Sequence, residues 1–384
     1  MIHINKFIPG GQAIGTMPDG RKIFFWNALP GEEVVKYDVT KKKSRYYEAI
    51  ATEISTPSPY RVQPQDDCFL STSPWQTLDW AQENIEKSAL VEEIFLEHHI
   101  DISVPPIITD GNPYHYRNKM EYALYWNNTT GQIDLAFHTR GSHRKVSINK
   151  SSIERPEIFQ KATEIITELN SRHEEARKYQ SLLLRCNQSG GVSGGLYENN
   201  KPHPSFPPLT DTILGHTYSY SPNGFFQINL PVYELALKEI KKHITTDKVL
   251  DLYSGVGTIG LSVARDRHLT LVESNKSAYQ ESLSNIHGLQ NVKSILTKSE
   301  DALGCITPDT TVILDPPRAG CDNKLINRLL EVTPPSIVYL SCNPATQARD
   351  VKYLLEKYTI SAIQPFNFFP RTPHIENLIC LKIS

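Results

Sequence analysis

The sequence predicts an α/β protein of 384 residues that has three parts. Short apolar runs separated by turn residues fill residues 1–56 and indicate a small β-barrel. Strand and helix patterns are mixed over residues 57–240, which favours a central α+β domain. Strands alternate with helices over residues 241–384, which predicts a doubly wound, mostly parallel sheet. At roughly 100–200 residues per domain, the length suits this organisation.

Residues 1–56 are expected to form a barrel of the OB type, because their short strands are separated by Pro–Gly and Pro–Asp–Gly turns. A basic and aromatic cluster at residues 41–47 includes Lys43 and Arg45. In an RNA-binding surface, lysines would contact phosphates and tyrosines would stack on bases. Lysines also protect the edges of sheets, so a solvated edge strand is an equally good interpretation.

The central region begins with a proline-rich linker at residues 57–64. Apolar residues at helical spacing over about residues 78–99 predict a helix, which we expect to pack on the C-terminal domain. Further along, the patterns predict strands at 119–126, 133–139 and 181–187 and one long helix near 157–180. The glycine- and proline-rich segment 189–208 is predicted to be a surface loop.

The first strand of the C-terminal part, residues 248–253, ends in a glycine-rich turn. Gly255, Gly257 and Gly260 form a GxGxxG pattern between this strand and a helix. Glycines let the backbone approach a ligand, and the helix N-terminus then faces that ligand. Glu273 ends the next strand, where a carboxylate can accept hydrogen bonds from ribose hydroxyls. The pattern predicts a nucleotide-type cofactor but leaves open whether it is NAD or S-adenosylmethionine.

Two further strand ends carry reactive side chains. Asp315 begins the DPPRAG segment, and Cys342 follows the next strand in the SCNP segment. Because ligands bind at the carboxyl ends of parallel strands, we expect both side chains in one crevice. A helix follows Cys342, and we expect its dipole to lower the pKa of the thiol. The other five cysteines lack this setting, so we interpret them as inert.

Composition excludes several classes of protein. Hydrophobic residues make up 39% and charged residues 21%, which is typical of a folded chain rather than a disordered one. Six scattered cysteines without a CxxC pair argue against disulfides, structural zinc and thiol redox chemistry. No apolar run reaches the ~20 residues of a membrane span, and the start lacks a signal-peptide pattern, so we expect a cytoplasmic protein. The net charge of −2 gives no sign of a nucleic-acid partner, so basic surface would have to be local.

With these motifs in order, the chain resembles the RNA (uracil-5-)-methyltransferases, which use S-adenosylmethionine to make 5-methyluridine in bacterial ribosomal and transfer RNA. The resemblance also includes NGFFQIN at 223–229 and FPRTPHIE at 369–376. Residues 1–56 resemble the TRAM domain of the branch that acts on ribosomal RNA. The resemblance implies a Rossmann-like class I methyltransferase domain at the C-terminus and a central RNA-binding domain.

The resemblance also implies roles for individual residues. Cys342 would be the nucleophile and Glu376 the proton acceptor. The cofactor would be held by Gln227, Tyr253, Gly255, Gly257, Glu273 and Asp315. Candidate RNA contacts, each of which could also be an ordinary surface charge, are Arg318, Lys43, Arg45, Arg117 and Lys119.

The sequence departs from the family at one place. Many members that act on ribosomal RNA hold a four-iron, four-sulfur cluster with four cysteines, and here only Cys68 stands in that region, while the distal cysteine is replaced near Ser151 and Ser152. Because such a cluster needs four ligands, we expect neither this cluster nor another metal.

The resulting prediction is methyl transfer to carbon 5 of a specific uridine, in 23S ribosomal RNA, through a covalent adduct of Cys342 with carbon 6 of the uracil. The alternative target is the T-loop of transfer RNA, which relatives without the cluster modify. Two alternatives come from other classes of function: an NAD-linked oxidoreductase, which the GxGxxG pattern allows, and a non-catalytic RNA-binding protein, which a barrel alone would allow. We expect a monomer.

Overall fold

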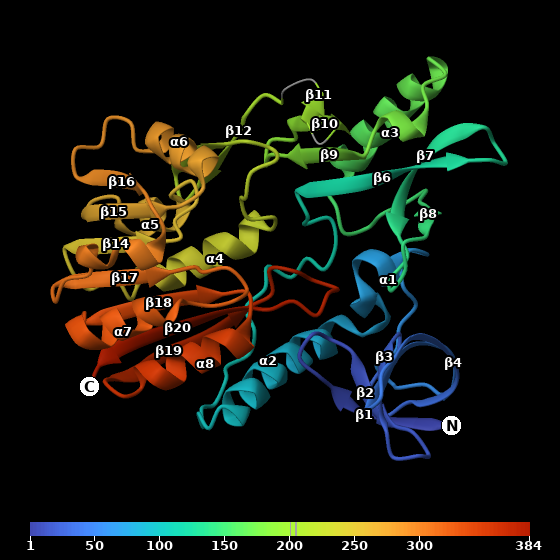
Figure 1. The fold of residues 1–384 in the computed structure, drawn as a ribbon, viewed down its shortest axis with the longest axis horizontal. Helices are drawn as coiled ribbons and strands as arrows, with labels where there is room; N and C mark the ends of the chain where they lie inside the picture. Colours follow the sequence, from blue (N-terminus) through green and yellow to red (C-terminus); the bar gives the residue numbers. More distant parts are fainter. Residues whose placement is uncertain (200, 204–205) are drawn as a thin grey trace.

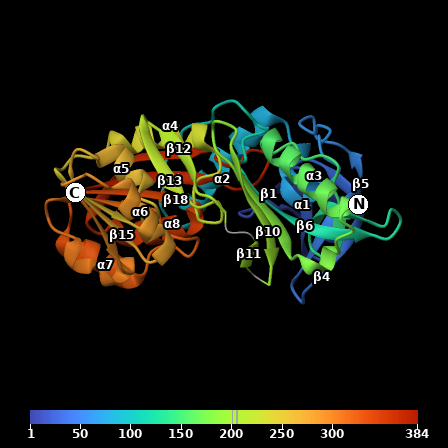
Figure 2. The same cartoon turned by 90° about the horizontal axis from the view of Figure 1, so that it is seen from above.

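The barrel and the central domain lie at one end of the molecule, and the C-terminal sheet lies at the other (Figures 1 and 2). These coordinates come from a computed structural model, which describes residues 1–199, 201–203 and 206–384. Helix α2 (Trp80–Glu97) runs from the barrel toward the C-terminal sheet. In the described part of the chain, no helix combines the length and the apolar character that crossing a membrane requires.

The predicted N-terminal barrel is confirmed. Its strands close in the order β1-β2-β3-β5-β4, and β3 and β5 are parallel neighbours. Alternate residues point inward, and Ile4, Ile23 and Phe25 are completely buried. The strands are β1 (Ile2–Phe7), β2 (Ala13–Thr16), β3 (Lys22–Trp26), β4 (Glu33–Lys42) and β5 (Tyr46–Thr56).

The barrel is joined to α2 by two short turns, α1 (Phe69–Thr72) and η1 (Pro74–Thr77). Helix α2 begins where the Asp79 carboxylate accepts hydrogen bonds from the backbone N–H groups of Ala81 and Gln82. Val91 and Phe95 of α2 are buried in the same hydrophobic core as Val351 of α8 (Pro344–Leu354). Helix α2 therefore packs against α8, which is one of the helices that cover the C-terminal sheet.

The central domain is an antiparallel sheet in the order β11-β10-β9-β6-β7-β8, with α3 (Pro156–Ser171) on one face. The helix ends earlier than the predicted residue 180, because His173 adopts a left-handed backbone with φ of +55°. A single turn, η2 (Ala176–Lys178), follows it. The strands are β6 (Lys119–Asn127), β7 (Gln132–His138), β8 (Lys145–Ser147), β9 (Ser181–Cys186), β10 (Val192–Glu198) and β11 (Lys201–His203).

The prediction of a surface loop at 189–208 is wrong over the two strands β10 and β11. Glycine enrichment suggested a loop, but Gly194 is needed because the backbones of β9 and β10 lie very close together. A Cβ atom at Gly194 would lie 2.2 Å from the carbonyl oxygen of Leu183, and its φ is +131°. Residues 200 and 204–205 of the predicted loop lie outside the described residues.

The C-terminal domain is the predicted doubly wound sheet, in the order β16-β15-β14-β17-β18-β20-β19. The first five strands are parallel, and β20 and β19 are antiparallel additions at one edge. The strands are β14 (Lys248–Leu252), β15 (His268–Glu273), β16 (Val292–Leu296), β17 (Thr310–Leu314), β18 (Ser336–Ser341), β19 (Tyr358–Phe366) and β20 (Glu376–Ile383). Beside α8, the helices are α5 (Thr258–Ala264), α6 (Lys276–Asn285) and α7 (Asn323–Val332).

The core of this domain includes residues before the expected boundary at 241. A hairpin of β12 (Leu209–Ile213) and β13 (His216–Tyr220) is followed by α4 (Leu230–Lys241). Tyr218 and Leu237 are completely buried in the same core as Leu271 of β15. The hydrophobic unit therefore begins near Leu209, because the hairpin and α4 cover one face of the sheet.

Candidate active site

The glycine-rich turn after β14 has a backbone that glycine makes possible. Tyr253, Gly255 and Gly257 have φ values of +62°, +57° and +89°. A Cβ atom at Gly257 would lie 2.8 Å from the Cδ1 atom of Leu271. The turn is held from below by the buried carboxylate of Asp251, which accepts a hydrogen bond of 2.8 Å from the backbone N–H of Gly260. The result is a concave backbone at the N-terminus of α5.

Glu273 supports this turn from the neighbouring strand. Its carboxylate accepts hydrogen bonds of 2.8 Å from the backbone N–H of Gly255 and 2.5 Å from that of Asn275. Glu273 also lines a cavity of about 830 Å³, together with Tyr253 and Ser299. The carboxylate therefore lies where the sequence predicted it, at the end of the second strand and beside the turn.

Gln227 and Asp315 meet at a smaller hollow of about 30 Å³, which Tyr253 also lines. Gly255 and Ser254 line the same hollow. The structure thus brings Gln227, Tyr253, Gly255 and Asp315 together, and Glu273 contacts Gly255 from the adjoining cavity. Gly257 does not line either cavity but caps α5 directly behind them.

The segment that carries Gln227 is held by side chains of the central domain. Asn118 donates from its Nδ2 atom to the carbonyl oxygen of Gln227 at 3.0 Å. Arg185, which is completely buried, donates to the carbonyl oxygens of Gly224 and Phe226. Arg185 was missed at the sequence level because it lies within an apolar strand pattern, and its only signal is a charge in a run that otherwise predicts burial.

Cys342 lies at the end of β18, directly before Asn343 caps α8. Burial, followed by the carboxyl groups of Glu376 and Asp315, raises the pKa of the Cys342 thiol to about 11, whereas Arg318 lowers it. The expectation of a lowered pKa is therefore wrong for the protein without ligands. Burial and two acidic neighbours outweigh the dipole of α8 and the charge of Arg318.

Glu376 begins β20 and is only 3% exposed. Its Oε2 atom has no hydrogen-bond partner among the described residues. Burial raises the pKa of the Glu376 carboxyl well above its ordinary value, Asp315 raises it further, and Arg318 lowers it. Burial also raises the pKa of Asp315 to about 7. These two carboxyl groups can therefore hold a proton near neutral pH, beside the thiol of Cys342.

The five candidate RNA contacts fall into three places. Lys43 and Arg45 are exposed at the turn between β4 and β5. Arg117 and Lys119 lie where the central domain meets the C-terminal domain, and the Lys119 ammonium donates to the carbonyl oxygens of Asn223 and Gly224. Arg318 is exposed next to Cys342. Lys119 thus supports the segment that carries Gln227, a role that its sequence context did not indicate.

The region of Cys68 contains a buried hydrogen-bond network instead of further thiols. The Asp66 carboxylate accepts bonds from the hydroxyl and the backbone N–H of Ser152, at 2.5 and 2.9 Å. It also accepts a bond of 2.8 Å from the Gln76 amide. Burial raises the pKa of the Cys68 thiol to about 12. Across the described residues, no group of three or more His, Cys, Asp or Glu side chains could hold a metal ion.

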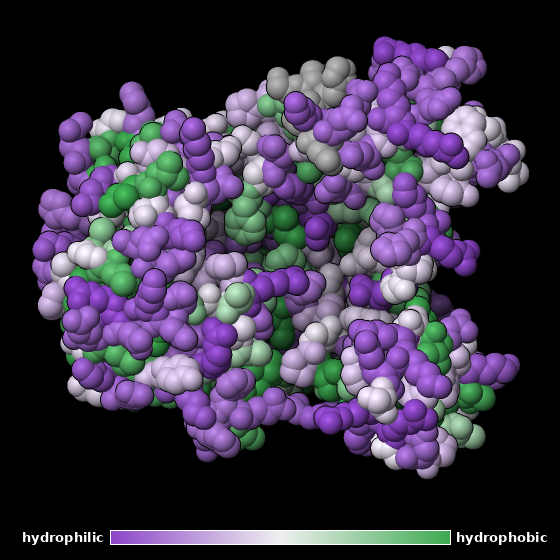
Figure 3. Space-filling view, in the orientation of Figure 1, coloured by the Kyte–Doolittle hydropathy of each residue, from purple (hydrophilic) through white to green (hydrophobic). Residues whose placement is uncertain are grey.

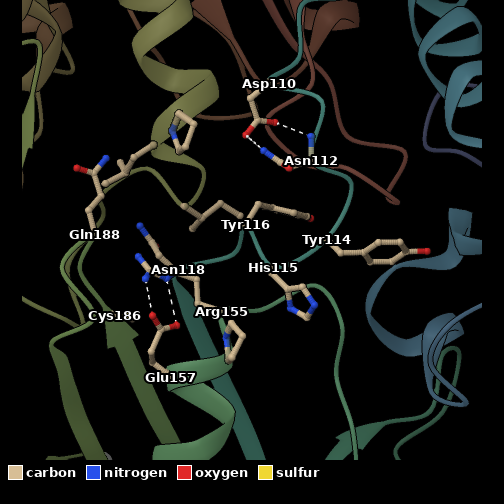
Figure 4. Close-up of a pocket in the computed structure, with 14 residues that line it drawn as sticks. Asp110, Asn112, Tyr114, His115, Tyr116, Asn118, Arg155, Glu157, Cys186 and Gln188 are labelled. Carbon is tan, nitrogen blue, oxygen red and sulfur yellow. Dashed lines mark hydrogen bonds and ion pairs between the residues drawn. The ribbon is translucent and has the colours of Figure 1, made fainter.

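A separate cavity of about 540 Å³ lies between the central domain and the start of α4. Figure 4 shows the ion pair of Arg155 and Glu157 on one side of it and Asp110 with Asn112 on another. Tyr116 lies in its wall, and the Tyr116 hydroxyl donates to the carbonyl oxygen of Pro370 at 2.9 Å. The surface is hollowed between the two lobes in the orientation of Figure 1, as the space-filling view shows (Figure 3).

A doubly wound sheet with a glycine-rich turn after its first strand, an acidic residue ending the second and reactive side chains at later strand ends defines a class I methyltransferase. The model of the tRNA (Uracil-5-)-methyltransferase family matches residues 214–383. Over these residues the chain is similar to that family.

Two relatives and one solved structure are similar to nearly the whole chain. An uncharacterized RNA methyltransferase of Prochlorococcus marinus is 29% identical and covers 92% of this chain and 99% of its own length. One from Bacillus anthracis is 28% identical and covers 100% of this chain and 96% of its own. The crystal structure of the Pyrococcus abyssi tRNA (uracil-54, C5)-methyltransferase in complex with S-adenosyl-L-homocysteine has the same fold, with a TM-score of 0.77, 24% identity and coverage of 99% of this chain and 100% of that one.

Proposed function

We propose that this enzyme transfers a methyl group from S-adenosylmethionine to carbon 5 of a specific uridine in RNA. The observation that carries the proposal is the meeting of Cys342, Glu376, Asp315 and Arg318 beside the hollow that Gln227 lines. A thiol, a buried carboxyl group and a cationic side chain in one place suit addition to a pyrimidine followed by removal of a proton. An NAD-linked oxidoreductase would have no use for this thiol and carboxyl pair.

The residues around the glycine-rich turn fit S-adenosylmethionine. The turn leaves space for a ligand at Gly255, which has no side chain and lines the hollow, and Glu273 lies beside it for ribose hydroxyls. The hydroxyl of Ser254 is buried in the hollow and has no hydrogen-bond partner among the described residues, so it is available to a ligand. Gln227 and Asp315 would hold the amino-acid end. The cofactor supplies an electrophilic methyl group when it is bound.

Cys342 performs the first chemical step on the uracil. Its thiolate forms a bond to carbon 6, and the electron pair of the C5–C6 double bond moves toward the carbonyl oxygen at carbon 4. Carbon 5 then becomes nucleophilic enough to form a bond to the methyl group, whose bond to the sulfonium sulfur would break with the electron pair left on that sulfur. Arg318 stabilises negative charge, both on the thiolate and on the enolate oxygen.

Glu376 performs the last step. Its carboxylate removes the proton from carbon 5, and the electron pair of that C–H bond restores the double bond and expels the Cys342 thiolate. Burial suits the group to this task, because a carboxyl group with a raised pKa is a stronger base than an exposed one. The uracil must leave its base stack to reach this site.

Two RNA targets are compatible with the site. The TRAM-like barrel led us to expect 23S ribosomal RNA. The Pyrococcus abyssi enzyme is named for transfer RNA, yet its fold covers 99% of this chain, so the barrel does not by itself separate the two targets. The description of the matching family model also names transfer RNA, which supports transfer RNA as the second candidate target.

The proposal is tested with Cys342→Ala and Glu376→Gln. Cys342→Ala should abolish methyl transfer but leave binding of S-adenosylmethionine, measured by calorimetry, within about twofold of wild type. Glu376→Gln should accumulate a covalent protein–RNA adduct that survives a denaturing gel. Cys305→Ala, which changes a partly exposed thiol outside the site, is the matched control and should retain activity. Methyl transfer by Cys342→Ala would refute the covalent mechanism.

The target is identified by mapping 5-methyluridine. Unmodified transcripts of 23S ribosomal RNA and of transfer RNA are incubated separately with the enzyme and labelled S-adenosylmethionine. Incorporation into a single uridine of the ribosomal transcript supports the first candidate, and incorporation into the T-loop supports the second. Incorporation into neither, with intact cofactor binding, would refute both.

A further inference from the structure

A buried network of polar side chains joins α2 to the segment 367–375, which directly precedes Glu376. Glu83 and Lys87 lie one turn apart on α2, and both are completely buried. The Lys87 ammonium lies 2.9 Å from the Glu83 carboxylate. It also donates to the Asn367 side chain at 2.7 Å and to the carbonyl oxygen of Phe369 at 3.1 Å. Lys87 therefore contacts the segment twice.

Glu83 contacts the same segment at Arg371 and at Asn367. Its carboxylate accepts hydrogen bonds from the backbone N–H of Arg371, at 3.0 and 3.1 Å, and from the Arg371 guanidinium at 3.2 Å. It also accepts a bond of 3.2 Å from the Asn367 amide. One carboxylate thus fixes both the backbone and the side chain of Arg371.

The backbone at Arg371 needs this support. Its φ is +62°, a left-handed conformation that residues other than glycine rarely adopt. Such a conformation persists only where several surrounding contacts hold the backbone in it. The carbonyl oxygen of Arg371 accepts a hydrogen bond from the backbone N–H of Trp75 at 3.0 Å, so the turn is held on both sides of the peptide chain.

The other two N-terminal parts of the chain reach the same segment. The Tyr116 hydroxyl, in the wall of the cavity in Figure 4, donates to the carbonyl oxygen of Pro370. Gly11 of the barrel lies so close to Pro373 that a Cβ atom would fall 2.0 Å from the Cβ atom of the proline. The barrel, α2 and the segment directly before β6 therefore all contact the residues that precede Glu376.

Burial of this ion pair is costly, because two charges are removed from water. An exposed pair would support α2 equally well. The buried pair also fixes the position of the segment 367–375, since the hydrogen bonds of Lys87 and Glu83 to it are directional. Glu376 is only five residues beyond Arg371, and β20 begins with it, so a displaced segment would displace its carboxyl group.

We propose that Lys87, Glu83 and Tyr116 are positioning residues that hold the Glu376 carboxyl group at the place from which it removes the proton on carbon 5. The inference rests on the proposed role of Glu376. Loss of these contacts should slow resolution of the covalent adduct and should leave formation of the adduct unchanged.

The test uses full-length Lys87→Met, which removes the bonds to Asn367 and Phe369 and leaves Glu83 paired with Arg371. The RNA substrate is whichever transcript the wild type methylates, labelled with tritium at carbon 5 of uridine. Tritium release measures proton removal, and a denaturing gel measures the adduct. We expect adduct formation within about twofold of wild type and tritium release about 10- to 100-fold slower.

Tyr116→Phe is the milder second variant, and Tyr358→Phe is its matched control. Tyr358 is also buried, and its hydroxyl donates to backbone carbonyl oxygens at Leu329 and Pro334, which lie outside the segment 367–375. Tyr116→Phe should slow tritium release about fivefold, and Tyr358→Phe should not slow it.

The outcomes separate the inference from the proposed function. If Glu376→Gln traps the adduct while Lys87→Met releases tritium at the wild-type rate, the positioning role is refuted and the proposed function stands. If Glu376→Gln does not trap the adduct, the proposed role of Glu376 fails and the inference fails with it, whereas absence of methyl transfer by the wild type would refute the proposed function. Should Lys87→Met not fold, Tyr116→Phe decides, because tritium release equal to that of Tyr358→Phe would overturn the inference.

Discussion

The thiol of Cys342 should react slowly in the protein without ligands. Its pKa is raised to about 11 by burial and by the carboxyl groups of Glu376 and Asp315. At about pH 8, only about one Cys342 side chain in a thousand is then a thiolate, against about one in four for a free thiol with a pKa of about 8.5. The reactive form is therefore about 240-fold rarer than in a free thiol.

Part of this deficit is offset by the basicity of the thiolate. A thiolate of higher pKa is the better nucleophile, with a Brønsted coefficient of about 0.45. A difference of about 2.5 pKa units makes each Cys342 thiolate about 13-fold more reactive. At equal access, alkylation of Cys342 should be about 20-fold slower than alkylation of a free thiol.

The assay follows iodoacetamide labelling of the peptide that contains Cys342 by mass spectrometry, with glutathione as the free thiol. From about pH 7 to about pH 9.5 the rate should rise about tenfold per pH unit, because the thiolate fraction does so below the pKa. Asp315→Asn removes a negative neighbour and should accelerate labelling by up to about tenfold. Arg318→Met removes the cation that lowers the pKa and should slow labelling.

The prediction requires Asp315→Asn and Arg318→Met to change the labelling rate in opposite directions. A labelling rate that levels off below about pH 9, or one equal to that of glutathione at about pH 8, would refute the raised pKa. Equal effects of Asp315→Asn and Arg318→Met would show that access, rather than charge, controls the thiol.

Three further predictions concern stability and RNA binding. Burial raises the pKa of Asp315 to about 7 from its ordinary 3.8, so the folded state keeps a proton that the unfolded chain loses, and stability falls as the pH rises through this window. Asp315→Asn should therefore gain in Tm relative to wild type between about pH 5 and about pH 8, and a constant difference would contradict the shift. Gly194→Ala should destabilise the protein by about 1–3 kcal/mol in urea titrations because its Cβ meets the Leu183 carbonyl oxygen, whereas Gly304→Ala, which meets no atom within 4 Å, should not. Lys43→Ala combined with Arg45→Ala should lower the slope of log affinity against log salt for RNA by about 1–2, and an unchanged slope would favour the edge-strand interpretation of that cluster.

Much of the fold could be predicted because the residue patterns that form its strands, turns and helices lie within short stretches of the sequence. Alternating apolar runs and turn residues identified the barrel, and the alternation of strands and helices identified the doubly wound sheet. The glycine-rich segment at 189–208 could not be interpreted locally. Gly194 serves the close approach of β9 to β10, and nothing within the segment itself shows that a partner strand lies there.

Some features of the candidate site could likewise be predicted from the sequence, and others could not. The glycine-rich turn, Glu273 and the strand-end positions of Asp315 and Cys342 follow from spacing, since the carboxyl ends of parallel strands meet at one edge. The pKa of the Cys342 thiol does not follow from spacing. It depends on burial and on Glu376 and Asp315, which come from other strands, so the dipole of the next helix alone predicted the wrong direction.

The sequence by itself determined the class of fold and the order of the motifs, and a family resemblance made Cys342 and Glu376 the candidate nucleophile and base. Those features depend on neighbours a few residues away and on strand order. Only the tertiary structure decided how the site is held. Glu83 and Lys87 are separated from Asn367 and Arg371 by more than half of the chain, and burial makes their mutual contacts directional and strong. No local pattern shows that a helix near the N-terminus fixes the residues that precede Glu376.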